Sequence, residues 1–102
     1  MKLDCKETKF SAHAILRMFE RQISKNVVIK GIQTGEVIAE YLDDKPYPSL
    51  LILSWVGIQP LHIIVAFDEG AKLCVVVTVY IPDPELWEND FKTRRKNEMC
   101  NL

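Results

Sequence analysis

Hydrophobic residues along this chain recur first with a helical period and then with the period of a strand. Ser11 is a typical N-cap residue, and the helical spacing that follows it predicts a first helix. The residues of this helix expected to face a core are Ala12, Leu16, Phe19 and Ile23. Ser24 and Gly35 bracket a second, shorter helix, whose expected buried residues are Val27, Val28 and Ile32.

Strand patterns occupy the middle of the chain. Alternating or continuous apolar runs predict four strands, at residues 36–42, 49–56, 61–67 and 72–81. After Pro82 the pattern predicts a last helix over residues 84–96, with Asp83 as its cap and Arg94, Arg95 and Lys96 in its last turn. The expected fold is one α+β domain over residues 1–102, with two N-terminal helices, a four-stranded antiparallel sheet and a C-terminal helix.

The alternation also predicts which side chains share a face of the sheet. In the fourth strand the odd-numbered residues are uniformly apolar, and the opposite face would carry Cys74, Val76, Thr78 and Tyr80. A hairpin loop at residues 68–71 would then bring His62 of the third strand beside Thr78 or Tyr80.

Composition narrows the class of protein. Of 102 residues 48% are hydrophobic, which excludes a disordered chain. The apolar runs are shorter than the ~18 residues of a membrane span, and no signal peptide is recognisable. The three cysteines lack C-x-x-C spacing, which favours a reducing compartment over a disulfide or a zinc site. We therefore expect a soluble, cytoplasmic domain without metal or cofactor.

Charge is unevenly distributed. Residues 1–30 hold seven Lys and Arg against three acids, residues 31–90 two against ten, and residues 91–102 four against one. If the two basic ends pack side by side, they form a positive face suited to a polyanion such as RNA. The alternative is that these charges are ordinary solvated helix faces.

Several polar side chains have the chemistry to bind or cut RNA. His13, Arg17 and Arg21 are spaced to stack on one face of the first helix, although Glu20 could neutralise Arg17 locally. Metal-independent cleavage of RNA needs a base, an acid and a cation for the phosphate, which histidine and arginine provide. We predict His13, His62, Tyr80 and Arg17 as catalytic. The predicted substrate-binding residues are Arg21, Thr78, Lys92, Arg94 and Arg95.

The sequence also resembles a known family. The segments that carry the resemblance are F-S-x-H-A-x-x-R-M-x-E-R-x-I-S (residues 10–24), T-G-E-V-I (34–38), P-Y-P-S (46–49), P-L-H-I-I-V-A (60–66), T-V-Y-I-P-D-P-E-L-W (78–87) and F-K-T-R-R-K (91–96). Over about residues 9–96 the chain is similar to a small bacterial family of domains of unknown function. That resemblance implies a RelE/MqsR-like ribonuclease toxin of a toxin–antitoxin system, with a barnase-like α+β plan. It also implies an antitoxin-like partner, of the zinc-finger or helix-turn-helix kind.

Two alternatives stay open beside the ribonuclease. One is a non-catalytic module that binds RNA or protein through the same face. The other is a structural subunit, for example a homodimer that pairs through an exposed strand edge. Two single residues also have two interpretations each. Cys74 is either a nucleophile or an inert thiol in the core, and Trp55 is either a surface on which a base stacks or a core residue.

Overall fold

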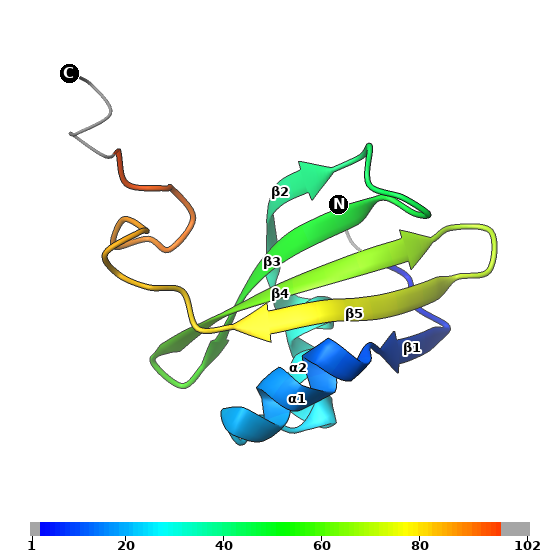
Figure 1. Cartoon of the computed structure of the whole chain (residues 1–102), viewed down its shortest axis with the longest axis horizontal. Coiled ribbons are helices and arrows are strands. Elements are labelled where there is room, and N and C mark those ends of the chain that lie inside the picture. Colours follow the sequence, from blue (N-terminus) through cyan, green and yellow to red (C-terminus); the bar gives the residue numbers. More distant parts are fainter. Residues whose placement is uncertain (1–2, 97–102) are drawn as a thin grey trace.

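The computed structural model describes residues 3–96 and folds them into one twisted sheet with two helices (Figure 1). The elements in chain order are β1 (Glu7–Phe10), α1 (Ala12–Glu20), α2 (Lys25–Thr34), β2 (Glu36–Tyr41), β3 (Ser49–Val56), β4 (Gln59–Asp68) and β5 (Leu73–Tyr80). The strand order is β1-β5-β4-β3-β2, with β1 parallel to β5 and the other neighbours antiparallel.

The expected four-stranded antiparallel sheet is wrong, because β1 adds a fifth strand. This strand has only four residues and alternates polar Glu7 and Lys9 with inward Thr8 and Phe10. It pairs in parallel with a strand that follows more than sixty residues later, as Glu7 lies opposite Leu73. A pairing partner so distant in sequence leaves no local pattern, so only the folded chain identifies it.

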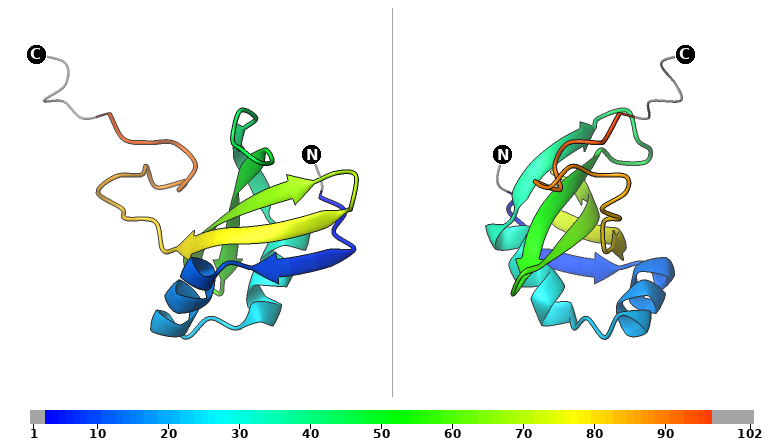
Figure 2. Two further views of the ribbon diagram at one scale, coloured as in Figure 1. Left: turned by 45° about the vertical axis from the view of Figure 1, so that its right-hand side comes forward. Right: turned by 90° about the vertical axis from the view of Figure 1, so that its left-hand side faces the viewer.

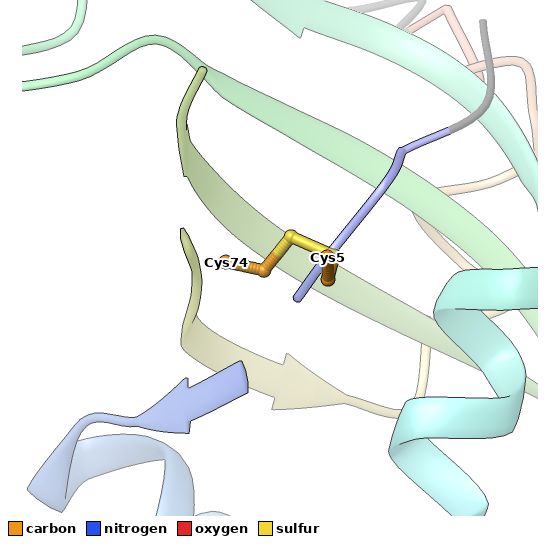
Figure 3. Close-up of a disulfide and its surroundings, with 2 residues drawn as sticks. All are labelled: Cys5 and Cys74. Atoms are coloured by element: carbon orange, nitrogen blue, oxygen red, sulfur yellow. A yellow bond between two sulfur atoms is a disulfide. The ribbon is translucent and has the colours of Figure 1, made fainter. Parts of the chain in front are cut away.

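A disulfide ties the chain before β1 to the neighbouring strand (Figure 3). Cys5 is bonded to Cys74, with 5.6 Å between their Cα atoms. The expectation that the chain forms no disulfide is therefore wrong, and Cys74 is a cross-linked core residue, not a nucleophile. Three cysteines without a motif gave no sign of this pair, because the parallel pairing of β1 and β5 creates the proximity.

The predicted C-terminal helix is also wrong for the described residues. Asp83 does cap a turn, since its side chain accepts from the Glu85 amide at 2.8 Å, but the turn does not propagate. The Asp90 carboxylate accepts from the Lys92 and Thr93 amides, and the chain reverses there. Phe91 has φ 56°, which is incompatible with a right-handed helix. Residues 82–96, the C-terminal segment, are therefore an irregular chain with one short bridge, from Trp87 to Arg94.

The two helices cover one face of the sheet, which we call the helix face (Figure 2). Its core contains the odd-numbered residues of β4, together with Ala14 and Met18 of α1 and Val28 and Ile32 of α2. The predicted stripe of α2 is confirmed, but that of the first helix is confirmed only for Ile23, which packs against this core. Ala12, Leu16 and Phe19 are exposed, the last two at 56% and 82%, and the buried residues of α1 are Ala14 and Met18.

A bulge in β5 decides which side chains reach the opposite, open face. The pairing shifts between Ile64 and Val65, so Val77 is an extra residue in the strand. Cys74, Val76 and Val79 therefore face the helices, whereas Thr78 and Tyr80 lie on the open face. The predicted uniform odd-numbered face of this strand is wrong, but the predicted pairing of His62 with Tyr80 is confirmed.

Gly35 ends α2 as predicted, for a reason other than a left-handed turn. Its φ of −76° suits any residue, but a Cβ here would lie 2.5 Å from the Gly31 carbonyl oxygen and 2.7 Å from that of Leu53. The end of α2 thus packs directly on the backbone of β3. This contact places β2, the next element, along the edge of the open face.

Candidate functional site

His62 lies on the open face of β4, directly under the C-terminal segment. Its side chain is fully buried, and both ring nitrogens are hydrogen-bonded. Nδ1 is 3.1 Å from the Tyr80 hydroxyl, and Nε2 is 2.8 Å from the Phe91 carbonyl oxygen. The Trp87 ring packs edge-on against the imidazole, with 4.6 Å between centroids. His62 therefore anchors the C-terminal segment to the sheet.

The hydrogen bonds of His62 determine where its proton lies. A carbonyl oxygen only accepts, so Nε2 donates to Phe91, and Nδ1 of the neutral ring accepts from the Tyr80 hydroxyl. Burial lowers the pKa of His62, and the hydrogen bond to the Phe91 carbonyl offsets only part of that shift. The ring is therefore neutral at pH 7, and it orients the phenol of Tyr80.

A hollow of about 380 Å³ lies between the C-terminal segment and β2, and we call it the Tyr80 hollow. Its polar and aromatic lining consists of Tyr41, Tyr80, Trp87, Lys92 and Arg94. The Arg94 guanidinium lies 5.4 Å from the centre of the Trp87 ring, and Lys92 Nζ is 2.8 Å from Glu36. The hollow thus places two phenols beside two cations.

The pKa of Tyr80 is raised from its ordinary value of 10.0. Burial is the largest cause, the neighbouring Tyr41 adds to it, and the positive charge of Arg94 acts in the opposite direction. At pH 7 the phenol is therefore protonated and serves as a hydrogen-bond donor or acceptor, not as an anion. Arg94 remains the group best suited to an anionic ligand in this hollow.

The structure does not bring all the predicted site residues together at one place. His13 and Arg17 lie on α1 and Arg21 is its C-cap residue, in the helix layer, whereas His62 points to the opposite face of the sheet. Arg17 Nη1 is 3.3 Å from Glu20 Oε1, so the local neutralisation weighed above is observed. The cations of α1 and those of the C-terminal segment accordingly lie on opposite sides of the sheet, so they do not form the expected single positive face.

The C-terminal cations have different surroundings. Arg95 is tied within its own segment, with Nε donating to the Pro84 carbonyl at 2.8 Å and Nη1 3.1 Å from Glu88. Arg94 instead lines the hollow. Thr78 lies on the open face but outside the lining. Of the predicted site residues, the structure therefore brings together Tyr80, Lys92 and Arg94, with His62 beneath them.

Two residues of the hollow were missed by the sequence reasoning. Tyr41 falls in the predicted strand at residues 36–42 and Trp87 in the predicted last helix, and neither was among the predicted site residues. Trp87 is indeed buried, at 8% exposure, but it also forms a wall of the hollow. Tyr41 follows a bulge between Val37 and Ala39. The bulge leaves no recognisable pattern in the sequence, but it sets the face of the sheet on which the Tyr41 side chain lies.

The family comparison matches residues 10–81 to a domain of unknown function, DUF4258. The match covers more than half of the chain, so the chain belongs to this family. It includes His62 and Tyr80 and ends before Trp87. No curated protein and no solved structure matches the chain. Among residues 3–96, no helix is long and apolar enough to cross a lipid bilayer.

Proposed function

We propose that this member of the DUF4258 family binds single-stranded RNA in the Tyr80 hollow. The observation that carries the proposal is the position of Arg94, whose guanidinium is held over the Trp87 ring at the rim of a hollow with two phenols. A planar guanidinium matches phosphate oxygens, and aromatic rings stack on unpaired bases. Lys92 supplies a second cation once its ion pair with Glu36 is exchanged for a phosphate.

The two pKa shifts favour binding over proton transfer. Burial makes His62 a weaker base and Tyr80 a weaker acid than the free side chains. Both groups therefore remain neutral near pH 7, whereas acid–base catalysis is most efficient with pKa values close to the working pH. The His62–Tyr80 pair acts, in this proposal, as a positioning device for the phenol and for the C-terminal segment.

The proposal is tested by fluorescence anisotropy with labelled single-stranded RNA over a series of salt concentrations. Arg94→Ala should weaken binding and reduce the slope of log Kd against log salt by roughly 0.7, the value for one phosphate contact on a single strand. Arg95→Ala is the matched control, because this neighbouring guanidinium is held by Pro84 and Glu88. Equal effects of the two substitutions, or binding that is insensitive to salt, would contradict the proposal.

Metal-independent cleavage of RNA is a second candidate, favoured by the hydrogen bond from the Tyr80 hydroxyl to His62. In this scheme the Tyr80 oxygen accepts the ribose 2′-hydroxyl proton while its own proton passes to His62 Nδ1. The 2′-oxygen attacks the phosphorus, Arg94 neutralises the phosphorane, and the 5′-oxygen leaves with a proton from water. The hydroxide formed takes the proton from the Tyr80 oxygen, and His62 Nδ1 returns its proton to the phenol. The predicted roles of His13 and Arg17 have no place here, because α1 lies across the sheet.

Cleavage and binding are separated by Tyr80→Phe. This substitution should abolish any products with 2′,3′-cyclic phosphate ends while retaining most of the affinity for RNA. Digestion is measured with the metal chelator EDTA present. Binding by the wild-type protein without such products would contradict the ribonuclease and leave the binding proposal intact.

The role as a toxin with an antitoxin-like partner belongs to this second candidate. Its expected outcome is growth arrest on induction in bacteria, lost in Tyr80→Phe. A cytoplasmic setting is part of the same proposal, and the Cys5–Cys74 disulfide argues against it, since disulfides are rare in reducing compartments. Growth arrest that persists in Tyr80→Phe would remove the link between toxicity and this hollow.

A further inference from the structure

A second hollow lies beside the Tyr80 hollow, and we infer that it is a subsite for a guanine base of RNA. This inference rests on the proposed function and adds a base preference to it. The hollow is the larger of the two, at about 530 Å³, and we call it the Trp55 hollow. Its lining includes Trp55, Glu36, Asp90 and Lys92.

Trp55 offers an aromatic surface to a planar ligand. Its side chain is 50% exposed at the end of β3, so the core position weighed in the sequence analysis is wrong. The Phe91 ring meets the indole edge-to-face at 6.1 Å, which holds the indole against the C-terminal segment. An exposed indole on a rigid strand beside a hollow is suited to stacking on an unpaired base.

The charged groups of the Trp55 hollow match one base better than the others. Glu36 provides a carboxylate acceptor and Lys92 a donor, whereas the Asp90 carboxylate already accepts from Lys92 and Thr93. The Watson–Crick edge of guanine has two adjacent donors, N1–H and the 2-amino group, beside one acceptor, O6. Glu36 can accept from both donors while Lys92 donates to O6. Uracil has a single donor on this edge, N3–H, between two carbonyl oxygens that the Glu36 carboxylate would repel, and adenine presents N1 as an acceptor where guanine has a donor.

Lys92 connects this subsite to the phosphate position. It lines both hollows, and its ion pair with Glu36 stands between them. Both hollows also border β2, with Glu36 at the start of the strand and Tyr41 at its end. A strand of RNA whose phosphate lies at Arg94 would therefore place a neighbouring base at Trp55.

The test compares six-nucleotide RNAs that differ at one base, UUGUUU, UUAUUU and UUUUUU. The chain has two tryptophans, and Trp87 lines the Tyr80 hollow, so quenching of indole emission is assigned to Trp55 by its loss in Trp55→Ala. We expect the guanine RNA to bind roughly tenfold more tightly than the others, as a bidentate base contact would give. It should also quench the emission, and Trp55→Ala should remove both the quenching and the tighter binding.

Glu36→Gln should abolish the preference for guanine while leaving binding of UUUUUU unchanged or tighter, because Lys92 is released from its ion pair. Glu40→Gln on the same strand, outside both hollows, is the matched control and should keep the preference. Equal affinities of the wild-type protein for the three RNAs, or no quenching, would overturn the guanine subsite. If Arg94→Ala still weakens binding in that case, the proposed function stands, whereas no binding of any RNA overturns both.

Discussion

The two faces of the sheet are covered in different ways. The helix face is closed by Ala14, Met18, Val28 and Ile32, which pack on fully buried aliphatic residues of β4 and β5. The open face is covered at one end by an irregular segment, held through hydrogen bonds and ring contacts of His62. Hollows occur on both sides: two that share Leu3 and Ile32 lie beside α2, and the Tyr80 hollow lies beside the segment that His62 anchors. In our proposal, the buried core and the RNA-binding hollows lie on opposite sides of one sheet.

The largest expected effect compares two neighbouring residues of β4. Ile63 is fully buried on the helix face, and Ile64 is half-buried on the open face. Ile63→Ala should lower the free energy of unfolding by about 3 kcal/mol, through lost burial and the cavity left behind. Ile64→Ala should cost about 1 kcal/mol or less. Urea unfolding measures both, and similar losses would show that the two faces do not differ in this way.

The next effect concerns the anchor of the open face. His62→Phe removes both hydrogen bonds of the imidazole and leaves the Phe91 carbonyl without its donor, at a cost of about 2 kcal/mol. The C-terminal segment should loosen, which a red shift of Trp87 emission would report. Tyr80→Phe removes one of these bonds and should cost less. An unchanged emission spectrum of folded His62→Phe would show that other contacts hold the segment.

His62 also predicts a pH dependence. Burial lowers its pKa in the folded protein below the ordinary value of 6.5, so the unfolded chain takes up the proton first as the pH falls. The contribution of His62 to stability is therefore complete above pH ~6.5 and is lost as the pH falls toward the folded-state pKa. Urea unfolding from pH 7.5 to 5 should show this loss in the wild type and in Tyr80→Phe. If His62→Phe shows an identical pH profile, the imidazole is not its source.

The smallest effect lies on the outer surface of α1. Arg17→Ala removes an exposed ion pair with Glu20 and should change the free energy of unfolding by about 0.5 kcal/mol or less. It should leave RNA binding unchanged, because α1 lies on the opposite side of the sheet from the Tyr80 hollow. Anisotropy measurements that show a loss as large as that of Arg94→Ala would move the interface to the helix layer.

Local patterns predicted most elements but not their assembly. The caps at Ser11 and Ser24 are confirmed by hydrogen bonds of 3.0 and 3.2 Å. The third and fourth predicted strands pair so that His62 lies opposite Tyr80, one of its two predicted neighbours. The C-terminal helix failed because Asp90 turns the chain back within the segment, a competition between side chain and backbone that periodicity ignores. The buried stripe of α1 failed because apolar residues lie on two of its faces, and packing chose Ala14 and Met18.

The candidate site was predicted in part for a related reason. Tyr80 and His62 are joined by a hairpin, so their contact follows from a short loop and strand parity. Lys92 and Arg94 were singled out by charge alone, and their place over the open face depends on Trp87 and Phe91, which bind His62 from more than twenty residues away. The side chains of His13, Arg17 and Arg21 are also suited to binding phosphate, but they lie on the opposite side of the sheet from the Tyr80 hollow.

The sequence by itself determined the two helices, the strands from residue 36 to residue 80 and the hairpin that joins His62 to Tyr80. Each of these elements depends mainly on residues that are close together in the sequence. Only the tertiary structure decided the parallel pairing of β1, the Cys5–Cys74 bond and the course of the C-terminal segment. Each of these depends on contacts between residues distant in sequence, whose free energy appears only when the whole chain packs. The separation of the basic residues onto two faces is a result of that packing.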